Sequence, residues 1–437
     1  MTRIFAARPR PIVPALLSAA ALLAACHRQQ PPPPAAETQP AQKPLSIELG
    51  KYRAVLATPG GDLPFFISLV RENDQVAAYL INGPELLPIH EVTLTGSHLE
   101  IMMPGYENKI TADAAGDTLS GELALSKLNG NDQHIPLTAK LGANYRFFPV
   151  APAGDEAPNN INVNGRWAAT FTDSDNTSEK DVGEFAQDGD VVTGTILTPT
   201  GDHRYLAGQV RGNELYLSTF DGAHAFLYKA TLGADGTLKG DFWSGLKSHE
   251  TFVAKRDANA HLVDPYAYTK MKRGEKHFAF AFPDLNGNTV TNNDPKFRGK
   301  VLIVALAGSW CPNCHDEAAF LEPLYRDYRD RGVEVVSLMF EHFGDFPRAA
   351  AATQRFRQQY SIDYTTLIAG VSDKDEAGKK LPMLSKFLAF PTTVFIDKKG
   401  NVRKIHTGFT GPATGGHYTE FVNETKAELD KLVAEKG

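Results

Sequence analysis

Hydrophobic and polar positions follow three different patterns along the 437 residues of this chain. Residues 12–25 form one apolar run behind an arginine-rich start. Residues 46–257 show short alternating runs broken by Gly, Asn and Asp, a pattern typical of strands. Residues 272–437 alternate continuous apolar runs with stretches whose apolar residues recur every three or four positions, as in buried strands and amphipathic helices. We therefore predict all-β domains followed by an α/β domain.

The all-β region contains an internal repeat, because three segments recur at offsets of 115 to 119 residues. The matching pairs are GKYRAVL (from Gly50) with GRWAATF (from Gly165), GSHLEI (from Gly96) with GNELYL (from Gly212), and GDTLSGEL (from Gly116) with DGTLKGDF (from Asp235). Each copy holds about eight candidate strands, which favours an up-and-down barrel or a closed sandwich. We predict two duplicated domains, at 46–148 and 160–257, joined by a linker at 148–160.

Few residues of the two repeats indicate a function. Tyr52 and Trp167 occupy matching positions, where they either line a ligand cavity or, as we favour, anchor the first strand of each copy in its core. His203, His224 and His249 lack the spacing of metal ligands and are interpreted as surface or strand residues. The expected role of these domains is binding, docking or spacing.

The first 25 residues have the features of an export signal: a positive start, an apolar run too short to cross a bilayer comfortably, and small residues at its end. The segment LAAC, which ends at Cys26, resembles the bacterial lipobox, whose cysteine becomes the lipidated first residue. The alternative is a simple secretory signal that contains a cysteine. Residues 26–45 are rich in Pro, Gln and Ala and predict an extended tether. Because His27 rather than aspartate follows Cys26, we expect a lipid-anchored protein on the periplasmic side of the cell envelope, in the outer membrane.

The strongest chemical signal begins with the apolar, β-branched run Val301–Ala307, which predicts a strand buried on both faces. A helical period follows, with Pro312 in its first turn, where a missing N–H does no harm. Cys311 is thereby placed at the start of the helix, where free N–H groups and the helix dipole stabilise a thiolate. Cys314 lies one turn later on the packing face. We expect an exposed Cys311 to attack disulfides and a shielded Cys314 to resolve the mixed disulfide.

Glu317 follows Cys314 by three residues, so its carboxylate lies beside that thiol on one side of the helix. A carboxylate there can exchange the proton of Cys314, and partial burial between Cys314 and Leu321 is expected to raise its pKa. The alternative is a solvated residue that interacts only with the helix dipole.

Trp310, the CPNC pair, Glu317 and the segment FPTTVFID (390–397) together resemble the TlpA/ResA-like thiol-disulfide oxidoreductases of the thioredoxin superfamily. The resemblance covers residues 272–437 and implies a thioredoxin fold. It implies that Pro391 is a cis-proline facing the dithiol, and that Trp310, Phe390 and Pro391 bind an extended substrate segment; the alternative is an ordinary proline at a strand edge. It further implies a reductase of protein disulfides that receives electrons from an inner-membrane thiol carrier.

The chain departs from the family pattern in three places, one of which is Leu306-Ala307 where the family has Phe-Trp before the motif. Ala305 stands where thioredoxin has a buried aspartate, so proton handling would fall to Glu317 or water. Ala319 stands where a helix-kinking proline is expected. These departures bear on the redox potential more than on the fold.

The remaining α/β elements follow from periodicity and turn residues. We predict a hairpin that turns at Asn286-Gly287, a buried strand at 333–340, helices at 349–360 and 381–388, a short strand at 364–368, a hairpin made of FPTTVFID and NVRKIH, and a closing helix at 418–432.

Charge and cysteine count exclude several function classes. The net charge of −6 argues against a nucleic-acid surface, and no glycine-rich phosphate loop precedes a helix. With Cys26 assigned to lipid, only Cys311 and Cys314 remain, which is too few for a typical structural zinc site. We therefore expect no metal and no cofactor.

Two alternative functions stay open. CPNCH also fits the c-type haem attachment pattern, with His315 as a ligand, which would make the chain an electron-transfer haem protein. Outside that pattern, His315 is expected to be an exposed helix residue that modestly tunes the thiols. The other alternative is a binding protein whose thioredoxin domain serves as a scaffold, although a scaffold does not need an intact cysteine pair.

Overall fold

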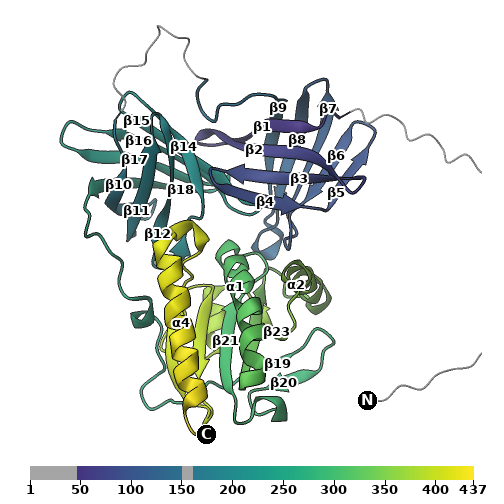
Figure 1. Ribbon diagram of the computed structural model, residues 1–437, viewed down its shortest axis with the longest axis vertical. Coiled ribbons are helices and arrows are strands. Elements are labelled where there is room, and N and C mark those ends of the chain that lie inside the picture. Colours follow the sequence, from purple (N-terminus) through teal and green to yellow (C-terminus); the bar gives the residue numbers. More distant parts are fainter. Residues whose placement is uncertain (1–46, 150–160) are drawn as a thin grey trace, which may run out of the picture. The chain divides into compact units, whose positions relative to one another are not determined.

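The computed structural model describes residues 47–149 and 161–437 (Figure 1). The predicted signal peptide (1–25), the tether (26–45) with Cys26, and nearly all of the predicted linker (148–160) lie outside these residues. Leu45–Gly437 form one compact unit. Within the described part of the chain, no helix has both the length and the apolar composition that a membrane crossing requires.

The first β domain is an antiparallel meander of nine strands, in the order β4-β3-β2-β1-β9-β8-β7-β6-β5. The strands are β1 (Gly50–Thr58), β2 (Gly61–Glu72), β3 (Gln75–Asn82), β4 (Glu85–Ile89), β5 (Val92–Thr95), β6 (His98–Met102), β7 (Lys109–Ala115), β8 (Thr118–Leu125) and β9 (Gln133–Leu141). Every pair joins neighbours in the chain except β1 with β9. Buried and exposed residues alternate along β9, so one face of the sheet is apolar and faces the core.

The second β domain is a ring of strands, because β11 pairs with both β10 and β12. Its strands are β10 (Gly165–Asp173), β11 (Ser178–Asp188), β12 (Val191–Thr198), β13 (Gly201–Asp202), β14 (Leu206–Arg211), β15 (Glu214–Phe220), β16 (Ala225–Leu232), β17 (Thr237–Ser244) and β18 (Ser248–Arg256). The closing pairs are β10 with β18 and β11 with β12. This domain is therefore an up-and-down barrel, one of the two architectures expected from the strand spacing.

The repeated segments occupy corresponding strands in the two domains. The first pair of segments lies at β1 and β10, the second at β6 and β15, and the third at β8 and β17. In each pair the strand numbers differ by nine, so the segments lie on equivalent strands. Each domain has nine strands in the described residues, one more than expected. Tyr52 and Trp167 are buried in the cores and bond to the carbonyl oxygens of Glu48 and Val163, so they are core aromatics rather than cavity walls. Descent of the domains from a duplication stays a prediction.

The two β domains share apolar contacts. Phe220 and Leu227 of the second domain belong to the hydrophobic core of the first. Buried Arg146 crosses the same junction, donating to the carbonyl oxygen of Ser218 over 2.8 Å and to Oδ1 of Asn82 over 3.1 Å. Shared apolar packing and a fully bonded arginine join the two sheets into one body.

The C-terminal domain is a five-stranded mixed sheet in the order β23-β22-β21-β24-β25, with helices packed on it (Figure 1). Its elements are β19 (Ala281–Pro283), β20 (Thr289–Thr291), β21 (Val301–Ala307), α1 (Pro312–Tyr328), β22 (Val333–Glu341), α2 (Phe346–Tyr360), β23 (Thr365–Val371), α3 (Lys374–Lys380), β24 (Thr392–Ile396), β25 (Val402–Thr407) and α4 (Gly416–Ala434). β21, β22 and β23 are parallel, and β24 is antiparallel to both β21 and β25. This is a thioredoxin-like arrangement with β21 in the centre.

The predicted helix at 381–388 is wrong. The helix in this region is α3 (Lys374–Lys380), which Asp373 caps by accepting from the N–H groups of Asp375 and Glu376. The following segment is irregular, with Leu381 and Leu384 buried and Leu384 bridged to Met271. Its apolar residues fill the core from a loop, and apolar spacing alone does not distinguish such a loop from a helix.

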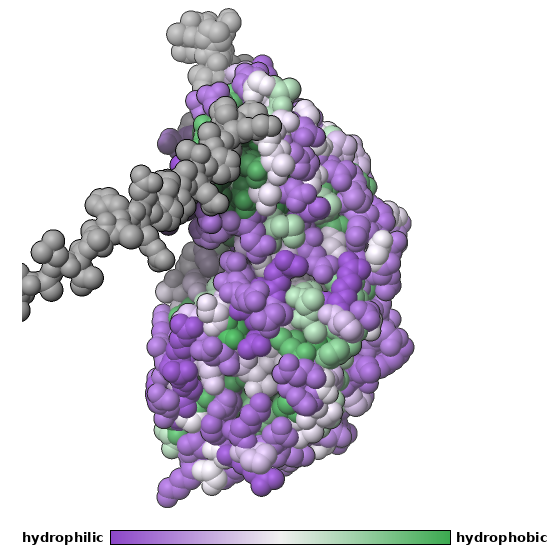
Figure 2. All heavy atoms as spheres, turned by 90° about the vertical axis from the view of Figure 1, so that its right-hand side faces the viewer, coloured by the Kyte–Doolittle hydropathy of each residue, from purple (hydrophilic) through white to green (hydrophobic). Residues whose placement is uncertain are grey.

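Polar residues cover most of the face seen in Figure 2, and apolar residues gather there only in small patches. Scattered apolar residues of this kind are normal on a soluble surface. This face does not by itself indicate a site, so the candidate site follows from the chemistry around the two cysteines.

Candidate active site

Cys311 and Cys314 lie where the central strand β21 leads into α1. Cys311 is the N-cap residue of α1, and its Sγ accepts from the backbone N–H of Cys314 over 3.3 Å. The two cysteines form a disulfide, with Cα atoms 5.2 Å apart. Pro312 occupies the first turn, as expected. Free N–H groups therefore point at the sulphur of Cys311, which favours its thiolate when the disulfide is reduced.

Both cysteines are buried, although Cys311 was expected to be exposed. The exposed fraction is 5% for Cys311 and 1% for Cys314. Residues 200–204 of the second β domain lie against the start of α1, on the residues that follow Cys311. Nη1 of Arg204 donates to the carbonyl oxygen of Pro312 over 3.2 Å. A Cβ atom at Gly201 would lie 1.7 Å from Nδ2 of Asn313, so the Asn313 side chain occupies space that only a glycine at position 201 leaves free.

The turn before Cys311 is held by a buried carboxylate that sequence reasoning missed. Glu341, at the end of β22, accepts from the N–H of Ser309 over 3.2 Å and from its hydroxyl over 2.6 Å. Thr353 of α2 donates to the same carboxylate over 3.0 Å. Burial raises the pKa of Glu341 to about 7. This acid fixes the loop that carries Trp310 and Cys311.

Trp310, Phe390 and Pro391 come together beside Cys311. The Phe390–Pro391 peptide bond is cis. The carbonyl oxygen of Phe390 lies 3.6 Å from Sγ of Cys311, and the Trp310 and Phe390 rings meet edge to face at 5.6 Å. Nε1 of Trp310 donates to the carbonyl oxygen of Phe340 over 2.8 Å. All the residues expected to bind a substrate segment therefore surround the first cysteine.

Glu317 is buried on α1 one turn after Cys314, with 2% of its surface exposed. The hydroxyl of Thr393 on β24 donates to its carboxylate. Thr393 is the cross-strand partner of Ala305, so the carboxylate reaches the sheet beside the position where thioredoxin has its aspartate. Burial raises the pKa of Glu317 to about 8, and the bond from Thr393 offsets only part of this effect.

His315 is buried rather than exposed, with an exposed fraction of 2%. Its Nδ1 lies 2.8 Å from the hydroxyl of Tyr360, and its Nε2 lies 2.7 Å from the carbonyl oxygen of Ser309. The ring stacks on Tyr106 of the first β domain at 3.8 Å. Burial lowers the pKa of His315 to about 3. Both ring nitrogens have partners, so a haem iron would have to displace a structural hydrogen bond.

Arg204 joins the three domains around the start of α1. Its guanidinium forms ion pairs with Glu85 of the first β domain at 3.0 Å, Asp221 of the second at 3.3 Å, and Asp316 of α1 at 3.2 Å. Glu85 and Asp221 are buried, and Asp316 is nearly so. The four residues are far apart in the sequence and share no motif, so no local signal could have identified this cluster.

The cluster has more acids than bases. Burial raises the pKa of Asp316 to about 7, and the charge of Arg204 offsets only part of this effect. Burial also raises the pKa of Glu85. Although burial opposes its ionisation, the pKa of Asp221 is held well below its ordinary value by His224 and Arg204. Arg204 thus pairs with one carboxylate whose pKa is lowered, that of Asp221, and with two whose pKa is raised, those of Asp316 and Glu85.

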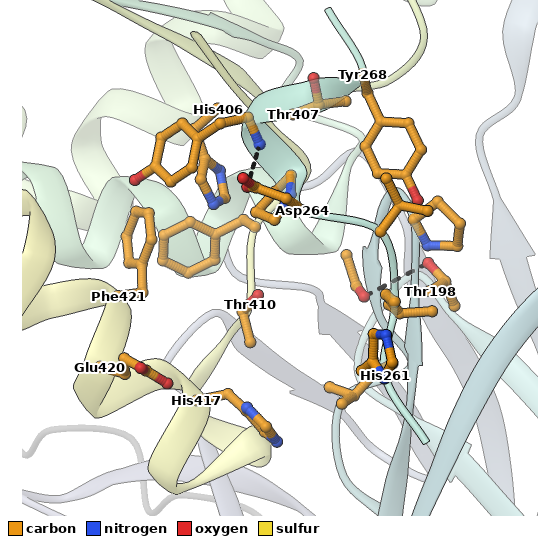
Figure 3. A pocket seen from close by; sticks show the side chains of 18 of the residues that line it. Thr198, His261, Asp264, Tyr268, His406, Thr407, Thr410, His417, Glu420 and Phe421 are labelled. Carbon is orange, nitrogen blue, oxygen red and sulfur yellow. Dashed lines mark hydrogen bonds between the residues drawn. The ribbon is translucent and has the colours of Figure 1, made fainter. Parts of the chain in front are cut away.

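Cavities lie where the β domains meet the C-terminal domain in the described part of the chain, and two of them adjoin its helices or its cysteine pair. One, of about 420 Å³, receives His417, Glu420 and Phe421 from α4 on one side and Thr198 and His261 on the other (Figure 3). The other, of about 410 Å³, is lined by Trp310 and Pro312, the two neighbours of Cys311, together with residues of both β domains. Only the second cavity adjoins the cysteine pair in sequence and is relevant to its chemistry.

The C-terminal part of the chain is similar to known proteins. The family model Redoxin matches residues 272–415. Thiol-disulfide oxidoreductase ResA of Halalkalibacterium halodurans is 27% identical over 138 residues, which are 31% of this chain and 69% of that protein. ResA of Bacillus cereus strain ATCC 10987 is 29% identical over 133 residues, which are 30% of this chain and 68% of that protein. A putative thiol:disulfide interchange protein DsbE from Chlorobium tepidum is 21% identical, with a TM-score of 0.29, and the likeness covers 37% of this chain and 99% of that chain.

Proposed function

Because the C-terminal domain belongs to the TlpA/ResA-like thiol-disulfide oxidoreductases of the thioredoxin superfamily, we propose that this chain reduces disulfides in the cell envelope through Cys311 and Cys314. The single observation that carries this proposal is the position of the cysteine pair. Cys311 caps α1, Cys314 lies within disulfide distance, and the carbonyl before Pro391 faces Cys311. A scaffold domain has no need of this arrangement.

The first chemical step is attack by the Cys311 thiolate on a substrate disulfide. The N–H of Cys314 and the start of α1 stabilise negative charge on the attacking sulphur. A new disulfide forms between Cys311 and the substrate as the substrate's own S–S bond breaks, and the first thiol leaves with a proton. Trp310, Phe390 and Pro391 are proposed to hold the substrate segment during this step.

In the second step Cys314 attacks Sγ of Cys311 and releases the second substrate thiol. Cys314 must first lose its proton, and Glu317 is the buried carboxylate one turn away. With a pKa raised by burial to about 8, Glu317 can both accept and return a proton near neutral pH. The substrate gains two electrons and two protons, and the Cys311–Cys314 disulfide remains.

The direction of electron flow is proposed from the surroundings of the dithiol. A dithiol is a strong oxidant when its thiolate is strongly stabilised. Here both cysteines are largely withdrawn from water. Burial disfavours thiolates and offsets the stabilisation that the start of α1 gives Cys311, so it favours the disulfide, as in a reductase. An upstream thiol carrier in the inner membrane would then restore the dithiol.

The cellular setting is part of the proposal. Residues 1–25 would direct export, and Cys26 would carry lipid that holds the protein on the periplasmic side of the outer membrane. The tether at 26–45 would separate the membrane from the folded part. The β domains, which we propose arose by duplication and extend over 46–148 and 160–257, would position the dithiol and control access to it.

The test of this function is a pair of single-cysteine variants. Cys311→Ser is expected to abolish disulfide exchange, because the remaining thiol of the pair, Cys314, is shielded from substrates. Cys314→Ser is expected to accumulate mixed disulfides on Cys311, which mass spectrometry of the intact protein after acid quenching would detect. Equal trapping by both variants, or turnover that survives Cys311→Ser, would contradict the assigned roles.

A further inference from the structure

The cavity beside Cys311 is a candidate binding site built mainly by the β domains. It measures about 410 Å³, within the range of small-molecule sites. Trp310, Pro312 and His342 form the part of its wall that belongs to the C-terminal domain. Cys311 is not itself part of the wall, but it lies in the chain between Trp310 and Pro312. A cavity of this size accepts one half of a small disulfide but not a folded protein.

The wall of the cavity is basic. Lys127, on the loop between β8 and β9, and Lys247, on the turn between β17 and β18, both line it, and no carboxylate does. Among residues 47–149 and 161–437, no acidic side chain forms an ion pair with either ammonium group. The acids that act on Lys127 from a distance are Asp221, which Arg204 and His224 already bind, and exposed Asp132.

Lys127 is partly buried and lies close to the active-site aromatics. Burial lowers the pKa of Lys127, as expected for an ammonium group without a close counter-ion. Its charge also acts on His342, whose ring stacks on Trp310 at 4.8 Å. The hydroxyl of Ser126, next in the chain, lines the same cavity and is buried without a hydrogen-bond partner. A partly desolvated cation and an unsatisfied hydroxyl together fit an anionic group with acceptor oxygens.

We propose that this cavity binds the carboxylate-bearing half of a small anionic disulfide and presents its sulphur to Cys311. This substrate class rests on the proposed disulfide reductase function. The Cys311 thiolate attacks one sulphur of the bound disulfide and the first thiol leaves. Cys314 then displaces the second thiol, and a dithiol reductant restores the pair. Lys127 and Lys247 bind the substrate carboxylate and take no part in bond breaking.

The test uses three disulfides of similar size: 3,3′-dithiodipropionate as the dianion, 2-hydroxyethyl disulfide as the neutral compound, and cystamine as the dication. The full-length protein is reduced with dithiothreitol, freed of reductant, and mixed with each compound. The rate of Cys311–Cys314 disulfide formation is then followed by tryptophan fluorescence. The intrinsic reactivities of the three compounds cancel when each variant is compared with the wild type on the same compound.

Lys127→Glu and Lys247→Glu are expected to slow the reaction with dithiodipropionate on the order of tenfold, because an attraction becomes a repulsion. The reaction with hydroxyethyl disulfide should be unchanged, and that with cystamine unchanged or faster. Lys239→Glu, on an exposed position of β17, makes the same change in net charge and should affect none of the three rates. High salt should reduce the advantage of the dianion in the wild type.

The outcomes separate this inference from the function on which it rests. If all three disulfides react but the lysine variants match Lys239→Glu, the anionic site is wrong and the reductase stands. If no disulfide oxidises the pair, both are wrong. Insulin provides a protein substrate for comparison, and its reduction should be insensitive to Lys127→Glu. An equal loss with insulin would assign the cavity to protein segments and overturn the small-disulfide proposal.

Discussion

Replacing Glu317 with glutamine tests the proposed proton transfer to and from Cys314. Glutamine keeps the shape of the side chain and an oxygen that can accept from Thr393, but it cannot take up a proton. With a pKa raised by burial to about 8, Glu317 is roughly one-tenth ionised at pH 7 and mostly ionised at pH 9. A general base of this kind contributes about 10²- to 10⁴-fold to a rate. We therefore expect Glu317→Gln to slow the attack of Cys314 on the mixed disulfide about 10²-fold at pH 9. At pH 7, where only about a tenth of Glu317 is ionised, the same substitution should slow this step only about tenfold.

The assay is stopped-flow measurement of the second step between pH 5 and pH 9. The mixed disulfide on Cys311 is formed rapidly with an excess of an activated disulfide, and release of the second thiol is recorded. Glu376→Gln, at an exposed acid of α3, is the matched control and should behave as the wild type. Superimposable pH–rate profiles for wild type and Glu317→Gln would remove Glu317 from the catalytic mechanism.

The same substitution has an expected effect on stability. The folded protein raises the pKa of Glu317 from 4.5 to about 8, so the folded state binds this proton more tightly than the unfolded state. The stabilising contribution of the bound proton is complete below pH 4.5 and is lost as pH rises through 8. The difference between the two pKa values corresponds to a change in the free energy of unfolding of at most about 5 kcal/mol. In urea unfolding of the oxidised protein, the free energy of unfolding of Glu317→Gln should therefore rise relative to that of the wild type as the pH is raised from 5 to 8.5. If the difference in unfolding free energy between the two proteins does not change with pH, the burial argument is contradicted.

Two further predictions concern the β domains and the anchor. Arg204→Met removes the guanidinium that pairs with three carboxylates and should weaken docking of the β domains by about 3–5 kcal/mol. Reduced Cys311 should then react faster with N-ethylmaleimide. Arg403→Met, which removes a surface cation, is the control, and an unchanged alkylation rate in Arg204→Met would refute the role of Arg204. Cys26→Ser should release the protein from the membrane fraction without changing its exchange rates, whereas a wild-type protein found entirely in the soluble periplasmic fraction would contradict lipid anchoring.

Local patterns in the sequence predicted the centre of the catalytic domain well. The run Val301–Ala307 is buried throughout and forms the central strand, and the following helix begins at Pro312 as expected. These elements depend on contacts among residues near one another in sequence, on turn chemistry and on capping. The helix expected at 381–388 failed because a buried loop shows the same apolar spacing as an amphipathic helix.

The surroundings of the cysteine pair could not be predicted in the same way. The contact of the second β domain with the start of α1 comes from a segment more than 100 residues earlier in the chain, where Arg204 donates to Pro312. Glu341 has no motif, and its partners Ser309 and Thr353 are brought to it only by the order of the strands. Local motifs therefore pointed to the candidate reacting groups, whereas the domain packing around them depends on contacts between distant parts of the chain.

The reduction potential of the Cys311–Cys314 pair tests the central claim most directly, because a reductase must hold its electrons at a potential low enough to pass them to substrate disulfides. The oxidised fraction of the full-length protein would be measured by thiol alkylation and mass spectrometry after equilibration in dithiothreitol buffers of known potential. With thiolates disfavoured by burial, we predict a value on the thioredoxin side of the superfamily range, about −220 to −270 mV. A potential near about −120 mV would identify an oxidant and contradict the proposed direction of electron flow.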